Sequence, residues 1–208
     1  MPELALERLS DRALTVSVDG AQTARALAEH LRRDPWLDVV AGLESVAVLF
    51  DPAGLSLAQA EELLAQQLAS FSPSEAPQAG GDIIIPVRYG GEAGPDLAVV
   101  AERAGVAEAD IIAMHTSSVY TVSVVGFLPG FAYLEGLNEA LATPRRAQPR
   151  PRVAAGSVGI GGALSGIYSL PGPGGWNIIG RTELTLFDPQ AEEPFTLKAG
   201  MRVRFKPL

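Results

Sequence analysis

The sequence predicts an α+β protein of two domains, a small N-terminal α+β domain followed by a C-terminal antiparallel β-barrel. Residues 71–81 (FSPSEAPQAGG) are rich in Pro, Ser, Ala and Gly, which is typical of a linker. Before them, strand-like runs alternate with apolar residues at helical spacing. After them, short strand-like runs alternate with Gly/Pro loops, as in small barrels. We therefore expect domains at residues 1–75 and 82–208.

Two helices and three strands are expected in the N-terminal domain. Leu27, Ala28 and Leu31 recur at helical spacing within residues 21–33. Ser56 is a suitable N-cap for a second helix, because its side chain can accept a hydrogen bond from a free backbone N–H. The helices are expected at residues 21–33 and 56–69, and the strands at 13–18, 37–40 and 46–50.

The C-terminal domain is expected to begin with a strand and two helices and to continue as a barrel. Asp96 can cap a helix over residues 96–104, and Gly105 can end it. A short helix is expected over residues 108–115. The strands are expected at residues 82–87, 119–125, 166–169, 177–179, 183–187 and 202–205.

Composition excludes several classes of function. The net charge of −8 argues against a nucleic-acid partner, whose affinity depends on Lys and Arg at phosphates. The absence of cysteine excludes disulfides, thiolate metal sites and a cysteine nucleophile. The start, MPELALERLS, lacks the basic and apolar pattern of a signal peptide, and the apolar runs are too short to span a bilayer. We expect a cytoplasmic protein without a membrane partner.

Residues 126–181 contain the candidate site, in loops dense in Gly and Pro. Phe127, Phe131 and Tyr133 could form the wall of an apolar pocket with a polar phenol tip, or could be core residues at a barrel corner. A basic segment follows with no acid within it, suited to bidentate binding of a carboxylate or phosphate. It could equally be a solvated face or a docking surface for an acidic partner. Its arginines are Arg145, Arg146, Arg150 and Arg152.

The Gly-rich segment at residues 156–162 (GSVGIGG) is not a nucleotide motif. It lacks the Lys-Ser/Thr of a P-loop and the spacing of a dinucleotide fingerprint. Its backbone N–H groups could stabilise an oxyanion, or the glycines could form a tight barrel turn.

His115 is the candidate general acid/base. It lies at the expected C-terminus of a short helix, where the helix dipole favours a protonated ring. A structural histidine bonded to a carbonyl is the alternative. His30, among charged residues, is expected at the surface. No His/carboxylate cluster indicates a metal site.

Taken together, the motifs of the second domain resemble, in order, the family that comprises 5-oxoprolinase B subunits, allophanate hydrolase subunit 1 and KipI. They are residues 86–92 (PVRYGGE), 94–97 (GPDL), 115–116 (HT), 126–131 (GFLPGF), 143–145 (TPR), 155–162 (AGSVGIGG), 166–168 (GIY), 173–176 (PGGW) and 179–182 (IGRT). One position departs from the family pattern: Leu164 stands where the family usually has Gln, which removes an amide donor and acceptor.

The resemblance implies a cyclophilin-like barrel and one component of a heteromeric hydrolase that is not active by itself. The implied reaction is the ATP-dependent opening of 5-oxoproline to glutamate, or hydrolysis of another small amide. The implied partner is the 5-oxoprolinase C subunit, or an allophanate hydrolase subunit 2-like protein, with a separate A subunit. Because this chain has no nucleotide motif, the ATP that the complex consumes is expected to bind elsewhere. The alternative is a non-catalytic, KipI-like inhibitor of a histidine kinase.

For the hydrolase, we expect His115 to transfer protons and Arg145 to bind the substrate carboxylate. The remaining substrate-binding candidates are Phe131, Tyr133, Arg146, Gly156, Ser157, Tyr168, Trp176 and Arg181.

Overall fold

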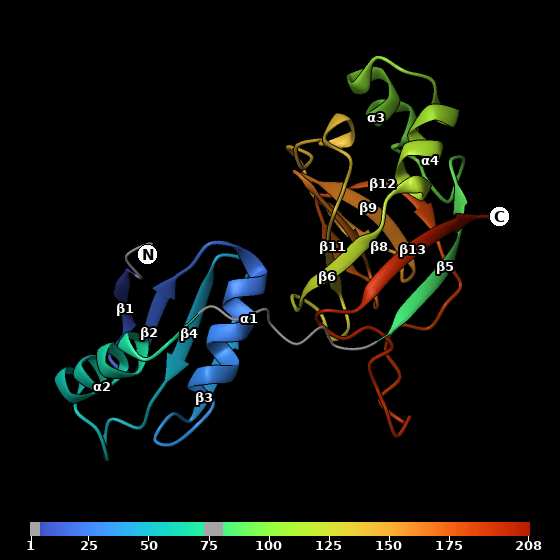
Figure 1. Cartoon of the computed structure of the whole chain (residues 1–208). Coiled ribbons are helices and arrows are strands. Elements are labelled where there is room, and N and C mark those ends of the chain that lie inside the picture. Colours follow the sequence, from blue (N-terminus) through green and yellow to red (C-terminus); the bar gives the residue numbers. More distant parts are fainter. Residues whose placement is uncertain (1–4, 73–80) are drawn as a thin grey trace. The chain divides into compact units, whose positions relative to one another are not determined.

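The structure, a computed structural model, describes residues 5–72 and 81–208. The chain divides into two compact units, Met1–Pro77 and Gln78–Leu208 (Figure 1). Most of the segment expected as a linker, residues 73–80, lies outside the described residues. None of the described helices has the length and apolar composition that crossing a bilayer requires.

The N-terminal unit is a four-stranded antiparallel sheet in the order β1-β2-β4-β3 with two helices. Its elements are β1 (Leu6–Ser10), β2 (Ala13–Ser17), α1 (Gly20–Leu31), β3 (Asp38–Ala41), β4 (Ser45–Leu49) and α2 (Leu57–Ala69). Strand β1 is missing from the sequence-based prediction, because its side chains are largely exposed and show no apolar alternation. Ser56 does cap α2, as expected: its side chain accepts a hydrogen bond from the backbone N–H of Gln59.

One face of this sheet packs on both helices. Leu14 pairs with Val48 and Val16 with Val46 across β2 and β4, and all four are fully buried. Leu31 of α1 and Leu64 of α2 belong to the same buried cluster. The unit therefore has a core of its own.

The C-terminal unit is a closed seven-stranded barrel in the order β10-β7-β6-β13-β5-β12-β9. Its first elements are β5 (Asp82–Tyr89), α3 (Leu97–Ala104), α4 (Glu108–Ser117), β6 (Tyr120–Val125), β7 (Ala132–Glu135) and a 3-10 turn (Glu139–Leu141). There follow β8 (Arg150–Val153), β9 (Ser157–Gly161), β10 (Leu164–Ile167), β11 (Gly172–Gly174), β12 (Asn177–Arg181) and β13 (Arg202–Pro207). Strands β8 and β11 form a separate two-stranded sheet.

The predicted α+β class with a C-terminal barrel is confirmed, with one difference in strand direction. Six of the seven barrel pairings are antiparallel, but β13 runs parallel to β5 while pairing antiparallel with β6. The last strand thus closes the barrel between the first two strands of the unit (Figure 1).

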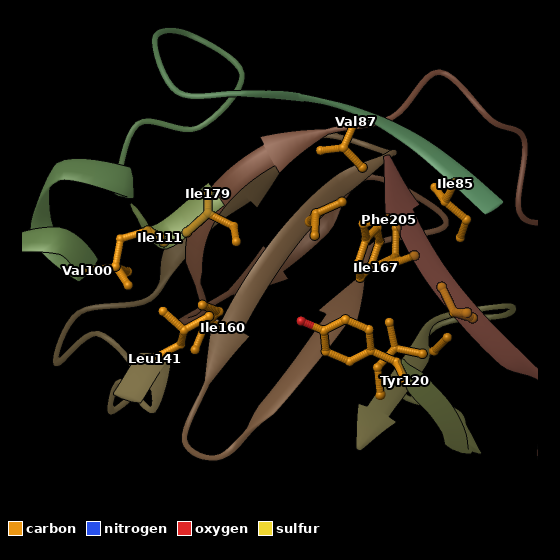
Figure 2. Packing of buried hydrophobic residues seen from close by; sticks show 14 of the residues in the cluster. Ile85, Val87, Val100, Ile111, Tyr120, Leu141, Ile160, Ile167, Ile179 and Phe205 are labelled. Atoms are coloured by element: carbon orange, nitrogen blue, oxygen red, sulfur yellow. The ribbon is translucent and has the colours of Figure 1, made fainter. Parts of the chain in front are cut away.

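The barrel is filled by apolar side chains that point inward from its strands. Figure 2 shows Ile85, Val87 and Phe205 converging from neighbouring strands on Ile167 and Tyr120. The residues Val100 of α3 and Ile111 of α4 belong to the same cluster. The two helices therefore cover part of the barrel core, and the interior offers a packed core, not a channel.

Two expected features of this unit are wrong. Residues 183–187 alternate like a strand but form only an isolated bridge, between Phe187 and Phe195. The Gly-rich segment at 156–162 is no loop: it contains the buried strand β9, which pairs with β10 and β12 on its two sides.

Candidate functional site

A pocket of about 240 Å³ opens among the aromatic and Gly/Pro-rich segments of the C-terminal unit. It is lined by Phe127, Tyr133, Arg145, Pro149, Tyr168, Pro173, Gly174, Gly175 and Trp176. We call it the aromatic pocket. It brings together three of the residues predicted to bind substrate (Tyr133, Tyr168 and Trp176) and also Arg145.

Phe131 lies at the centre of the aromatic cluster that supports the pocket. It is 1% exposed, and its ring meets four neighbours edge-on. The centroid distances are 5.6 Å to Phe127, 4.8 Å to Tyr133, 5.0 Å to Tyr168 and 5.6 Å to Trp176. Such edge-to-face packing stabilises one arrangement of the rings. Phe131 is therefore a core residue behind the wall and is not itself among the lining residues.

Two glycines of the barrel leave room for the indole of Trp176 against the strands β9 and β10. A Cβ atom at Gly161 of β9 would lie 2.7 Å from the indole, and one at Gly166 of β10 would lie 2.8 Å from it. Any larger residue would displace the ring. Leu164, where the resemblance leads us to expect Gln, is partly buried against the same aromatic cluster.

Arg145 supplies the pocket with a cation. Its guanidinium carbon lies 5.6 Å from the centroid of the Trp176 ring, within the range of a cation–π interaction. No carboxylate among residues 5–72 and 81–208 lies within ion-pairing distance of Arg145. The guanidinium is thus available to an anionic group of a ligand.

Two phenols add hydrogen-bond donors. Burial raises the pKa of Tyr168, opposed by a backbone hydrogen bond to Trp176 and by the nearby cations Arg145 and Arg150. Burial also raises the pKa of Tyr133, against the smaller effect of Arg145. Because an unperturbed phenol already titrates near pH 10, both hydroxyls stay protonated at neutral pH and can donate to a ligand oxygen.

Arg146, predicted to bind substrate, is engaged elsewhere. Arg146 Nη1 lies 3.0 Å from Asp96 Oδ1, and Arg150 Nη2 lies 2.8 Å from the same oxygen. Asp96 occupies the N-cap position of α3, as expected, but its side chain makes no capping hydrogen bond. The negative charge that pairs with the basic segment thus comes from Asp96, which precedes Arg146 by 50 positions in the sequence.

The structure places His115 in the barrel core. The side chain has no exposed surface, and its ring stacks on Phe205 at 4.5 Å. Nδ1 lies 2.8 Å from Tyr89 Oη and Nε2 3.0 Å from Ser165 Oγ. Burial lowers the pKa of His115 to about 3, so the expectation of a protonated ring is wrong because desolvation outweighs the helix dipole. The aromatic pocket does not include this side chain.

Gly156, Ser157 and Arg181 also lie outside the aromatic pocket. The Gly156 N–H donates to Tyr168 O at 2.7 Å, and Ser157 is a buried residue of β9. Since the Gly162 N–H likewise donates to Thr143 O, both ends of the segment expected to bind an oxyanion use their amides within the fold. Arg181 lines a different pocket, of about 420 Å³, with Arg88, Glu92, Ala93 and Glu183.

Sequence reasoning missed several pocket residues. Phe127 was expected in an aromatic wall but not named as a ligand contact; it is 59% exposed and has a left-handed φ of 73°. That conformation is costly for a large residue and is often found at functional positions. Pro173 and Gly174 belong to the motif at residues 173–176 (PGGW) but were not named as ligand contacts, and the signal for Pro149 was only the density of Pro in its segment. Among the described residues, no group of three or more His, Asp or Glu side chains could hold a metal ion.

Comparison with known proteins identifies the family. The family described as carboxyltransferase domain, subdomain C and D, matches residues 4–197. The B subunit of 5-oxoprolinase from Escherichia coli O157:H7 is 46% identical over 172 residues, which cover 82% of this chain and 78% of that protein. The B subunit of 5-oxoprolinase from Bacillus subtilis (strain 168) is 35% identical, covering 96% of this chain and 91% of that protein.

Solved structures also match this chain in sequence or in fold. The crystal structure of TTHA0988 is 37% identical with a TM-score of 0.79, covering 95% of this chain and 40% of that one, so this chain spans about two-fifths of that protein. The K. lactis urea amidolyase matches 99% of this chain with a TM-score of 0.81, over 15% of its own length; at 18% identity this likeness concerns the fold alone. The chain therefore belongs to the carboxyltransferase subdomain C and D family, in the group that includes the B subunits of 5-oxoprolinase.

Proposed function

We propose that this chain is the B subunit of a heteromeric 5-oxoprolinase-type hydrolase and that its aromatic pocket binds the substrate. The observation that carries the proposal is the guanidinium of Arg145, which no described carboxylate pairs, beside an aromatic wall. The 46% identity to a 5-oxoprolinase B subunit supports the same assignment. The complex would open 5-oxoproline to glutamate at the expense of ATP.

The pocket matches the chemistry of this substrate, a small lactam ring with a carboxylate. Arg145 would bind the carboxylate through charge-assisted hydrogen bonds. The indole of Trp176 would cover the ring, and the phenols of Tyr133 and Tyr168 could donate to the carboxylate or the lactam carbonyl.

Partner proteins would supply what the pocket lacks. Among the described residues that line it there is no histidine and no carboxylate to act as a general base. The chain also has no P-loop or dinucleotide motif. We therefore assign ATP binding and the base to the partners, a C subunit or allophanate hydrolase subunit 2-like protein together with an A subunit.

The test is an assay of the assembled complex. This chain is co-expressed with the A and C subunits and assayed with 5-oxoproline, allophanate and urea as separate substrates. Phosphate release is measured with all three, together with glutamate formed from 5-oxoproline and ammonia formed from allophanate or urea. Arg145→Met should lower kcat/KM for 5-oxoproline by about tenfold to hundredfold, the loss expected for a hydrogen bond to a charged group.

Arg152→Met is the matched control, since Arg152 is an exposed arginine of β8 that does not line the pocket. It should retain parental kinetics in an equally stable complex. If the parental complex released no phosphate with 5-oxoproline, and Arg145→Met behaved no differently, the proposal would be wrong. Stable capture of a histidine kinase by such an inactive chain would instead support the KipI-like function.

A further inference from the structure

A single buried carboxylate links the two sides of the aromatic pocket. Asp96, 3% exposed, accepts hydrogen bonds at Oδ1 from Arg146 Nη1 (3.0 Å) and Arg150 Nη2 (2.8 Å). Its Oδ2 accepts the backbone N–H of Ile178 at 2.7 Å, and its own N–H donates to Ile178 O at 2.9 Å. All four contacts are thus made by one residue just before α3.

These partners flank the two pocket residues that stack on each other. Arg146 directly follows Arg145, and Ile178 lies two residues after Trp176 at the start of β12. Asp96 therefore ties the segment that carries Arg145 to the strand that follows Trp176. Arg145 and Trp176, whose guanidinium carbon and ring centroid lie 5.6 Å apart, are thus in the two segments that Asp96 connects.

The same carboxylate pairs with two arginines of the basic segment and leaves Arg145 unpaired among the described residues. It is shared by Arg146 and Arg150, whereas Arg145 has no carboxylate within ion-pairing distance in the described chain. Arg150 also has a buried Nη1 atom with no hydrogen-bond partner among the described residues, so Asp96 supplies the main compensation for this guanidinium. Burying a carboxylate is costly unless several hydrogen bonds satisfy it, as they do here.

We propose that Asp96 is a positioning residue of the aromatic pocket, which holds residues 145–150 against β12 and so keeps the Arg145 guanidinium over Trp176. Its position before α3 does not explain it, because the side chain makes no capping bond. For the nature of the ligand, this inference rests on the proposed function; for the geometry, it rests on the contacts alone.

The main chain of the segment has further ties, so the effect of losing Asp96 should be local. The Arg146 N–H donates to Gly175 O at 2.7 Å, and Asn177 Nδ2 donates to Pro144 O at 2.9 Å. These bonds keep the backbone of the segment near Trp176. Asp96 holds the side chains of Arg146 and Arg150. Its loss should therefore loosen the side chain of Arg145 over Trp176 without unfolding the barrel.

The first experiment uses the fluorescence of Trp176 in the full chain. The protein has two tryptophans, and Trp36→Phe leaves Trp176 as the sole emitter. In that background, Asp96→Asn should shift the emission maximum in the same direction as Arg145→Met, because both remove the cation from the ring. An amide is isosteric, but it cannot accept from both the arginines and Ile178 N–H. Asp82→Asn is the control: Asp82 pairs with Arg202 at 2.7 Å on the exposed surface.

The second experiment measures kinetics of the assembled complex. Asp96→Asn should raise KM for 5-oxoproline about tenfold and leave kcat within about twofold, as expected when a group that binds the substrate is misplaced. Since the spectral experiment needs no substrate, it tests Asp96 even if 5-oxoproline is not the ligand. An Asp96→Asn protein with the emission and KM of its parent would overturn the proposal.

A milder variant covers the case in which Asp96→Asn does not fold. Arg150→Met removes one of the two arginine contacts and leaves Asp96 paired with Arg146. It should shift the Trp176 emission in the same direction by a smaller amount. An Arg150→Met protein that keeps the parental spectrum would likewise contradict the proposal.

Discussion

Gly174 and Gly175 are neighbours in the lining of the aromatic pocket, yet only Gly174 limits the space for Tyr168. A Cβ atom at Gly174 would overlap the phenol oxygen of Tyr168, whereas one at Gly175 would have no neighbour closer than 3.5 Å. We expect Gly174→Ala to displace the phenol and weaken substrate binding about tenfold, with Gly175→Ala close to the parent. Calorimetric titration of the complex with 5-oxoproline measures both. Equal affinities of the two variants would contradict this role for Gly174.

His115 should make the stability of the barrel depend on pH. Its pKa is about 3 in the folded protein and about 6.5 in an unfolded chain, so below about pH 6.5 only the unfolded chain takes up the proton. Stability should therefore fall by up to about 1.4 kcal/mol per pH unit as pH decreases from about 6.5 toward 3.

The matching variant is His115→Gln, which cannot titrate. It loses hydrogen bonds to Tyr89 and Ser165, and should therefore be less stable than the parent at neutral pH. The difference in unfolding free energy should shrink by about 2 kcal/mol between about pH 7.5 and pH 5. Urea unfolding followed through Trp176 in a Trp36→Phe background measures it. A difference that is constant over this range would show that His115 is not the cause.

At the scale of elements, the sequence predicts a helix or strand well where its apolar residues recur with a single helical or strand period. Helices α1, α2, α3 and α4 and strands β2 and β5 lie close to their predicted positions. Strand β9 was missed because four glycines in and around it, Gly156, Gly159, Gly161 and Gly162, resemble turn residues. The need for glycine depends on a long-range partner, since the indole of Trp176 lies against Gly161. Such a requirement has no local signature.

The candidate site shows the same limit. Arg145, Tyr133, Tyr168 and Trp176 were identified from their residue types and the family motifs, and the fold brings them into one pocket. The complete burial of His115 was not predicted, because helix position alone does not reveal it. Asp96 was recognised only as a helix cap, since its arginine partners lie 50 and 54 residues away. Long-range pairing decides the role of a titratable group, and the sequence does not contain that pairing explicitly.

At the scale of the whole molecule, the two units have separate hydrophobic cores. The cluster that contains Leu64 shares no residue with the barrel cluster that contains Leu134. Each unit also carries its own tryptophan. Trp36 donates its indole N–H to Gln67 Oε1 on α2 at 2.8 Å, and Trp176 lies in the aromatic cluster of the second unit. The chain therefore contains one natural fluorescent probe for each core.

We expect core substitutions to affect only the unit in which they lie. Leu64→Ala removes a fully buried side chain and should cost the N-terminal unit about 2–5 kcal/mol, while Leu134→Ala should cost the barrel a similar amount. Urea unfolding is followed through Trp36 in a Trp176→Phe background and through Trp176 in a Trp36→Phe background. Leu64→Ala should lower the midpoint of the Trp36 transition alone, and Leu134→Ala that of the Trp176 transition alone. Midpoints that move together in both variants would mean that the two cores unfold as one cooperative unit.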